Sequence, residues 1–452
     1  MKAHFIAIGG SVMHQLAIAL LKKGYEITGS DDEIFEPART NLEKAGILPA
    51  KEGWFREKVH GRLDAVILGM HAKADNPELI RAKELDLPVY SFPEFIFQVS
   101  KNKKRIVVGG SHGKTTTTSM IMHVLKKMEK KFDYLVGAKL EGFDQSVSIT
   151  DAPIIVCEGD EYPASVLEKR PKFHFLFPHI AIITGIAWDH INVFPTFEMY
   201  LEQFNIFINK IEPGGVLIYN DTDPILKKLV SDHPSKVERI GYGIPKHEIR
   251  EGKTVIRIDG KEGELKVFGN HNLLNLHAAY LACKQLGIDA QQFIDSISTF
   301  TGASKRLELL AGNASTNVYR DFAHAPSKVK ATMDAVKQQF PERKLIAALE
   351  LHTYSSLNEK FMNEYNGAME AADSAAVFYS KHALEIKRLP DLPKEKIIDG
   401  FGKEGLKVFN QKSELEEWLV SQSYEDSNLL LMSSGNYDGI DVTTFAHQIT
   451  NT

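Results

Sequence analysis

The stretch IVVGGSHGKTTTTSM, residues 106–120, decides the fold of this chain. An apolar run, Ile106–Val108, leads into a glycine-rich turn, and the turn opens into a segment whose pattern predicts a helix. Glycines let backbone N–H groups approach phosphate oxygens closely, and the start of a helix adds a favourable dipole. Lys114 is placed to reach the β- and γ-phosphates of a nucleotide, and the Thr115 hydroxyl to hold Mg²⁺. The stretch therefore predicts a phosphate-binding turn between a strand and a helix.

This turn is a shorter form of the common phosphate-loop pattern, because Val108 stands where the full pattern has a glycine. The alternative is a glycine-rich turn that contains GKT by chance, and the strand before and the helix after it argue against that alternative. The residues predicted to contact ATP at this turn are Gly110, Ser111, His112, Gly113, Lys114, Thr115 and Thr116.

Carboxylates follow a second apolar run, in the sequence IIVCEGDE at residues 154–161. In open α/β sheets, ligands bind beyond the carboxyl ends of the strands. A carboxylate there suits a hard cation that prefers oxygen ligands, so Glu158 is predicted to hold Mg²⁺ together with Thr115. Asp189 and His190 follow the next predicted strand, Ile180–Thr184, and are expected at the same edge of the sheet.

The composition describes an ordinary globular protein. Hydrophobic residues make up 43% and charged residues 25% of the 452 residues, and the net charge is −5. That charge gives no overall basic field for nucleic acid, and no apolar stretch approaches the roughly 18 residues of a membrane span. The two cysteines exclude a disulfide framework and fit a reducing compartment. We expect a cytoplasmic protein that binds neither nucleic acid nor membrane, as a monomer or weak homodimer.

Strand and helix patterns alternate along the whole chain, which predicts an α/β fold with mostly parallel sheets. The alternation is expected to form three domains: a Rossmann-like domain at residues 1–102, a central domain at 103–302, and a second Rossmann-like domain at 303–452. The N-terminal domain begins with a strand, the turn Gly9-Gly10-Ser11 and a helix over Met13–Lys22. Such a domain is also compatible with a dinucleotide, but the phosphate loop would then have no role.

The motifs GSHGKTTTT, EGDEY, DH, FGNHNLLN, SKRLE and DFAHAP resemble, in order and spacing, those of the Mur ligases. These are ATP-dependent enzymes that form amide bonds in bacterial cell-wall synthesis. The resemblance implies a UDP-sugar-binding domain, a central ATPase domain, and a C-terminal domain that closes on the nucleotide. It departs from the family at Ala187, where the motif before DH usually has glutamate, and at Ala325, which replaces a histidine.

The resemblance also implies roles for residues that the chain's own pattern leaves open. His190 would hold a second metal ion, and Arg306 would bind phosphate or the charge of the transition state. For the sugar nucleotide, the diphosphate would contact Gly9, Gly10 and Ser11, and Asp31 would bind uridine or ribose. The remaining nucleotide contacts would be Asn272 and Asn275 at the adenine, and Asp321 and His324 at the ribose and phosphates. Capping of a helix is the alternative role for Asn272.

Within the family, the N-terminal HFIAIGGSVM resembles the branch that binds UDP-N-acetylmuramate. One ligase of this branch adds the tripeptide L-Ala-γ-D-Glu-meso-diaminopimelate in peptidoglycan recycling, and another adds L-alanine in biosynthesis. The segments EYPASVLEKRPKF (161–173) and MSSGNYDGI (432–440) favour the tripeptide ligase, with the L-alanine ligase as the alternative. The loop Glu350–Leu357 departs from the recycling enzyme's pattern. A non-catalytic nucleotide-binding protein and an ATPase that drives motion are more distant alternatives.

Overall fold

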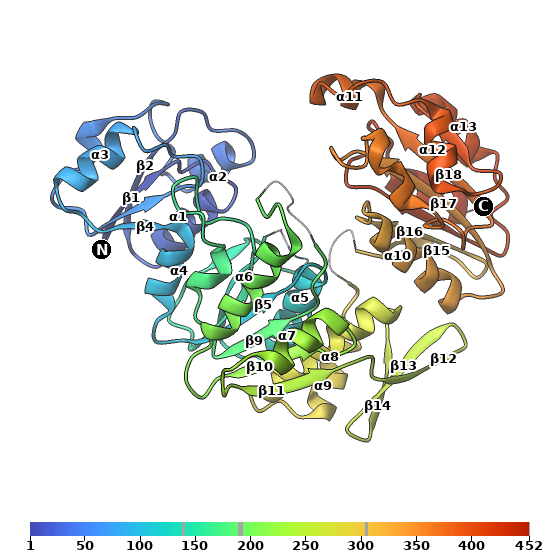
Figure 1. Ribbon diagram of the computed structural model, residues 1–452, viewed down its shortest axis with the longest axis horizontal. Helices are drawn as coiled ribbons and strands as arrows, with labels where there is room; N and C mark the ends of the chain where they lie inside the picture. Colours follow the sequence, from blue (N-terminus) through green and yellow to red (C-terminus); the bar gives the residue numbers. More distant parts are fainter. Residues whose placement is uncertain (138–139, 141, 189–192, 303–305, 452) are drawn as a thin grey trace. The chain divides into compact units, whose positions relative to one another are not determined.

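The computed structural model describes residues 1–137, 140, 142–188, 193–302 and 306–451 (Figure 1). By its internal contacts the chain divides into two compact units. The first consists of residues 1–245 and 274–297, and the second of residues 246–273 and 298–452. The predicted borders of three domains stay a prediction.

The first unit begins with a four-stranded sheet in the order β2-β1-β3-β4, in which all neighbouring strands run parallel. The strands are β1 (Lys2–Ile6), β2 (Glu26–Ser30), β3 (Ala65–Leu68) and β4 (Val89–Ser91). The helices that connect and follow them are α1 (Met13–Lys22), α2 (Ala38–Lys44), α3 (Pro77–Glu84) and α4 (Phe92–Ser100). Local signals set the helix starts: Asn76 accepts hydrogen bonds from the N–H groups of Glu78 and Leu79 at the start of α3.

A seven-stranded sheet forms the rest of the first unit, in the order β11-β10-β9-β5-β8-β6-β7. Only the β6–β7 pair is antiparallel among its described pairs. The strands are β5 (Lys104–Gly109), β6 (Phe132–Leu135), β7 (Val147–Ser148), β8 (Ile154–Glu158), β9 (Ile180–Ile183), β10 (Val216–Asn220) and β11 (Glu238–Tyr242). The helices are α5 (Lys114–Lys127), α6 (Phe197–Asn209), α7 (Pro224–Asp232), α8 (Asn270–Lys284, whose first residues belong to the second unit) and α9 (Ala290–Ile297).

The second unit contains a six-stranded sheet, β15-β16-β20-β17-β18-β19, which is parallel except for its β15–β16 edge. Its strands are β15 (Glu308–Gly312), β16 (Thr316–Asp321), β17 (Lys344–Leu351), β18 (Ser374–Tyr379), β19 (Lys407–Phe409) and β20 (Ser427–Met432). Its helices are α10 (Pro326–Gln339), α11 (Lys381–Lys387), α12 (Lys394–Phe401), α13 (Lys412–Val420) and α14 (Val442–Thr450).

The predicted α/β class with mostly parallel sheets is confirmed. The expected helix Met13–Lys22 has the predicted bounds, and β5 contains the apolar run that opens the deciding stretch. Sequence analysis missed the small antiparallel sheet of β12 (Lys246–Arg250), β13 (Lys253–Ile258) and β14 (Lys261–Leu265). Its first strand, KHEIR, is exposed along its whole length, so it carries no hydrophobic alternation. Among the described residues, no helix is both long and apolar enough to cross a membrane.

Arg105 fixes the start of β5, the strand that leads to the phosphate loop. Its guanidinium is buried and donates hydrogen bonds to four main-chain carbonyls and to the Glu212 carboxylate at 2.5 Å. The carbonyls belong to Ser100, Lys101, Lys103 and Phe177. A planar fork with five donors suits this set of acceptors, and the side chain therefore joins the end of α4 to the central sheet.

We predict that Arg105→Ala lowers the free energy of unfolding by about 3–5 kcal/mol, because it leaves several buried acceptors without a donor. Urea unfolding measures the change. The matched control is Arg170→Ala, which removes an exposed ion pair with Glu168 and should cost less than about 1 kcal/mol. Equal losses in the two variants would contradict the structural role of Arg105.

Candidate active site

The phosphate loop joins β5 to α5, as the sequence predicts. Two of its glycines have backbone angles in the left-handed region, with φ of 123° at Gly110 and 83° at Gly113. A Cβ atom on Gly113 would lie 2.2 Å from the Asn275 Oδ1 atom, and one on Gly110 would lie 2.3 Å from the Thr184 Oγ1 atom. Both positions therefore require glycine, and the start of the helix that follows them is the kind of place where backbone N–H groups bind anions.

Lys114 is the first residue of α5, and its side chain turns back over the loop. The Nζ atom donates to the Gly110 carbonyl at 2.6 Å and to the two Glu161 carboxylate oxygens at 2.9 and 2.8 Å. A cation at a helix N-terminus adds to the charge that the helix dipole already places there. The loop therefore has the charge and the donors that a triphosphate needs.

The predicted magnesium pair lies together. The Thr115 hydroxyl donates to the Glu158 Oε1 atom at 2.8 Å, and the Gly137 N–H donates to Oε2 at 3.1 Å. The hydroxyl and the carboxylate offer the oxygen ligands that Mg²⁺ prefers. His190 and Asp189 lie outside the described residues. Among the described residues, no group of three or more His, Cys, Asp or Glu side chains could by itself hold a metal ion.

The two asparagines of the FGNHNLLN motif have different surroundings. The Asn275 Oδ1 atom accepts a hydrogen bond from the Thr117 hydroxyl at 3.3 Å, beside Gly113 of the phosphate loop. The Asn272 amide donates to the Phe268 carbonyl at 2.9 Å, just before α8 begins. Both side chains are buried. The Asn272 contact is not that of an N-cap, whose side-chain oxygen would accept a backbone N–H, so its role stays a prediction. Asn275 packs against the phosphate loop itself.

In the second unit, the structure brings Arg306, Asp321 and His324 to the carboxyl end of β16. The Arg306 guanidinium lies 4.9 Å from the centre of the Phe322 ring. Asp321 accepts hydrogen bonds from the Leu307 and Ala323 N–H groups at 2.5 and 2.6 Å. Burial raises the pKa of Asp321 to about 6, although the positive charge of Arg306 acts in the opposite direction.

In the N-terminal sheet, the structure brings Asp31 and the glycine turn together. Asp31 follows β2, and its Oδ2 atom accepts a hydrogen bond from the Gly9 N–H at 2.6 Å. Burial raises the pKa of Asp31 to about 6, and the neighbouring Asp32 adds to the rise. The Gly9 N–H is thus already bonded, while the turn continues through Gly10 and the exposed Ser11 toward α1.

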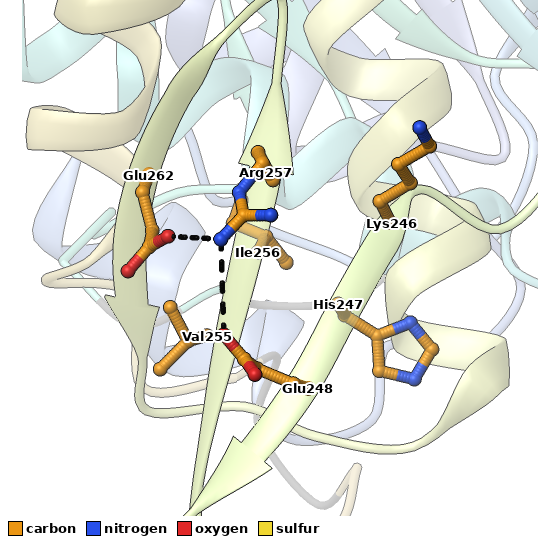
Figure 2. A pocket seen from close by; sticks show the side chains of 7 residues that line it. All are labelled: Lys246, His247, Glu248, Val255, Ile256, Arg257 and Glu262. Atoms are coloured by element: carbon orange, nitrogen blue, oxygen red, sulfur yellow. Dashed lines mark hydrogen bonds and ion pairs between the residues drawn. The ribbon is translucent and has the colours of Figure 1, made fainter.

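A shallow hollow lies elsewhere, on the exposed antiparallel sheet β12–β14 (Figure 2). In it the Arg257 guanidinium is 2.7 Å from the Glu262 carboxylate and 3.8 Å from that of Glu248. These ion pairs are largely exposed, and such pairs contribute little binding or folding energy. We therefore assign no binding or catalytic role to this hollow.

Comparisons with known proteins decide the family. A model of the Mur ligase family catalytic domain matches residues 2–104, one of the Mur ligase middle domain matches 108–283, and one of the Mur ligase glutamate ligase domain matches 305–435. The UDP-N-acetylmuramate–L-alanine ligase of Sulfurihydrogenibium sp. is 33% identical over 83% of this chain and 82% of its own.

This chain belongs to the Mur ligase family. Its members are ATP-dependent ligases that form carbon–nitrogen bonds in peptidoglycan synthesis. Among solved structures, the UDP-N-acetylmuramate–alanine ligase of Thermotoga maritima is 22% identical with a TM-score of 0.68, covering 100% of this chain and 98% of its own. The Neisseria meningitidis UDP-N-acetylmuramate:L-alanyl-γ-D-glutamyl-meso-diaminopimelate ligase is 26% identical with a TM-score of 0.60, covering 66% of this chain and 98% of its own.

The family and the three-domain architecture predicted from the motifs are thereby confirmed, and the roles of the individual site residues stay predictions. Sequence analysis of this Mur ligase missed Glu161 and Tyr200, which the structure places at the phosphate loop. Glu161 lies within the quoted EGDEY motif and could have been considered as a partner for a lysine. Tyr200 stands in a helix with no motif of its own, so no signal in the sequence marked it.

We predict that Gly113→Ala weakens binding of Mg·ATP by about tenfold or more, because a Cβ atom strains the left-handed backbone and displaces Asn275. Equilibrium titration with a fluorescent ATP analogue measures the dissociation constant. Gly46→Ala is the control, since Gly46 has φ of 72° but nothing within 4 Å of the added carbon. Unchanged affinity in Gly113→Ala would show that ATP does not use this loop.

Proposed function

We propose that this Mur ligase joins an amine to the lactyl carboxylate of UDP-N-acetylmuramate at the expense of ATP. The observation that carries the proposal is the phosphate loop, where Lys114 and Thr115 open α5 and the Thr115 hydroxyl donates to the Glu158 carboxylate. These groups supply a cation, backbone donors and oxygen ligands at one point. That combination suits a reaction in which phosphate charge must be held close to a second anion.

The proposed reaction has two steps. A carboxylate oxygen of UDP-N-acetylmuramate attacks the γ-phosphorus of ATP, and ADP leaves to give an acyl phosphate. The amine then attacks the acyl carbon and loses a proton, and phosphate leaves as the amide forms. Because the carboxylate and the triphosphate are both anionic, Lys114 lowers their repulsion by holding the β- and γ-phosphates. Exclusion of water then protects the acyl phosphate from hydrolysis.

Thr115 and Glu158 would hold Mg²⁺, with His190 as the further ligand implied by the family resemblance. A bound Mg²⁺ would supply positive charge to the phosphate oxygens. In the other unit, Arg306, Asp321 and His324 would contact the nucleotide. The diphosphate of the sugar nucleotide would contact Gly9, Gly10 and Ser11. Its uridine or ribose would bind Asp31. Asn275 would face the adenine from its place beside the loop.

L-alanine is the amine that we propose first. The relative from Sulfurihydrogenibium sp. bears the name of an L-alanine ligase, and so does the solved structure from Thermotoga maritima. These two names support L-alanine, which the sequence analysis gave as the alternative, better than they support the tripeptide. L-alanine is also the smaller substrate, and it requires no site for the distal carboxylate of diaminopimelate.

The tripeptide L-Ala-γ-D-Glu-meso-diaminopimelate is the second candidate. It is favoured by the segments 161–173 and 432–440, and by the solved Neisseria meningitidis ligase whose name contains this peptide. Beside the loop Glu350–Leu357, the Lys387 ammonium lies 5.1 Å from the centre of the exposed Tyr354 ring. A cation at this place suits an amine substrate that carries several carboxylates.

The amine is tested by phosphate release from Mg·ATP and UDP-N-acetylmuramate, with free L-alanine compared with the tripeptide. We expect phosphate release with L-alanine and at least about a hundredfold lower kcat/KM with the tripeptide, because a site specific for L-alanine would leave the additional carboxylates of the tripeptide unpaired. Release with the tripeptide alone would replace the first candidate by the second. Release with neither amine would contradict the proposed reaction, and omission of UDP-N-acetylmuramate is the control for plain ATP hydrolysis.

A further inference from the structure

A buried ion pair links the phosphate loop to the segment that follows β8. The Glu161 side chain is 1% exposed, and both of its oxygens lie within 2.9 Å of the Lys114 ammonium. Glu161 stands three residues after Glu158, so the same segment reaches both Thr115 and Lys114. A buried carboxylate is strongly destabilising without its counter-ion, so the pair constrains where the ammonium can lie.

The Tyr200 hydroxyl connects this ion pair to the other end of the loop. Tyr200 lies on α6, is fully buried, and reaches Glu161 at 3.4 Å and the Ser111 hydroxyl at 2.8 Å. The Ala187 N–H donates to the Ser111 oxygen at 2.8 Å. Because an N–H can only donate and a carboxylate can only accept, the direction of the chain is fixed. The Ala187 N–H donates to Ser111, Ser111 to Tyr200, and Tyr200 to Glu161.

We propose that Glu161 and Tyr200 are positioning residues, which hold the Lys114 ammonium at the place where it acts on the phosphates. The proposal rests on the use of this loop for ATP in the proposed function. Glu161 fixes the ammonium, and Tyr200 fixes Glu161 while it also holds Ser111. Both ends of the loop, Ser111 and Lys114, are thus tied to one buried network, drawn from the segments that follow β8 and β9 and from α6.

The contacts of Lys114 indicate which one changes when a nucleotide binds. Its three protons are directed at Glu161 and at the Gly110 carbonyl. Exchange of a neutral carbonyl for a phosphate oxygen is less costly than separation of a buried carboxylate from its counter-ion. Lys114 therefore keeps Glu161 and gives up Gly110. The ammonium then bridges the protein carboxylate and the phosphates, in a position set by the protein.

This arrangement predicts different effects on binding and on turnover. Loss of the Glu161 charge removes a carboxylate that repels the phosphates, so ATP binding should not weaken. It also leaves the ammonium free to adopt positions that suit bound ATP but not the transition state, so kcat should fall. A residue that merely supports the fold of the loop would weaken ATP binding as well.

The test compares Glu161→Gln and Tyr200→Phe with the unaltered enzyme. We expect Glu161→Gln to lower kcat by about tenfold or more while the dissociation constant of Mg·ATP stays within about threefold or decreases. Tyr200→Phe, which removes a single hydroxyl, should lower kcat in the same way by about threefold to tenfold. Unchanged kcat in both variants, or ATP binding weakened about tenfold in Glu161→Gln, would overturn the proposal.

The matched control is Asp133→Asn. Asp133 is also a buried carboxylate of the first unit, with its Oδ2 atom 2.8 Å from the Lys103 ammonium, but it contacts no residue of the phosphate loop in the described structure. This variant should lower the melting temperature, but it should not lower kcat selectively while ATP affinity stays unchanged. If Asp133→Asn lowered kcat as much as Glu161→Gln at unchanged ATP affinity, the effect would come from general destabilisation.

A second readout requires no substrate and separates this proposal from the proposed function. An amine-reactive acylating reagent labels lysines, and mass spectrometry reports the rate at each site. An ammonium that is held by a buried carboxylate reacts slowly, so Lys114 should label at least about threefold faster in Glu161→Gln than in the unaltered enzyme or in Asp133→Asn. Equal rates would overturn the proposal. If no amine supports turnover, the proposed function fails, while ATP affinity and labelling still decide the positioning role.

Discussion

The ion pair between Lys114, at the first turn of α5, and Glu161 is the interaction on which the proposed active site depends. A triphosphate and a substrate carboxylate repel each other, so the enzyme must supply positive charge and donors before the reaction begins. The glycines of the loop permit the close backbone approach, and the helix start adds its dipole. The buried Glu161 carboxylate balances the ammonium, and in the proposed complex it stays bonded to Lys114 while phosphate oxygens replace the Gly110 carbonyl. The positive charge of Lys114 is therefore in position before the substrates bind.

The parallel sheet brings the other groups to this charge. In the order β9-β5-β8, the central strand carries the phosphate loop and its neighbours end at Ile183 and Glu158. All three strands run in the same direction, so their carboxyl ends lie at one edge. Glu158 therefore meets Thr115, although the two residues are far apart in the chain. Arg105 anchors the opposite end of β5, which keeps the strand that bears the loop in register with the sheet.

Sequence reasoning predicted those parts of the site that depend on local pattern or on strand direction. The strand, turn and helix of residues 106–120 follow from an apolar run, glycines and GKT, and the meeting of Thr115 with Glu158 follows from parallel strand ends. The contact of Tyr200 with Glu161 depends on how α6 packs, and no periodicity reports that. The exposed β12 lacks hydrophobic alternation, so its sheet was missed. The choice of amine was not predictable, because the loop Glu350–Leu357 departs from the recycling enzyme's pattern while segments 161–173 and 432–440 resemble it.

The most direct test of the central claim follows the oxygen atoms of the acceptor carboxylate. UDP-N-acetylmuramate labelled with a heavy oxygen isotope in its lactyl carboxylate is incubated with Mg·ATP and the amine that supports turnover, and the released phosphate is analysed by mass spectrometry. An acyl phosphate transfers one carboxylate oxygen to phosphate when the amide forms, so the account predicts labelled phosphate in step with product. Unlabelled phosphate at full turnover would show that the carboxylate never bonds to the γ-phosphorus, and would contradict the mechanism built on this loop.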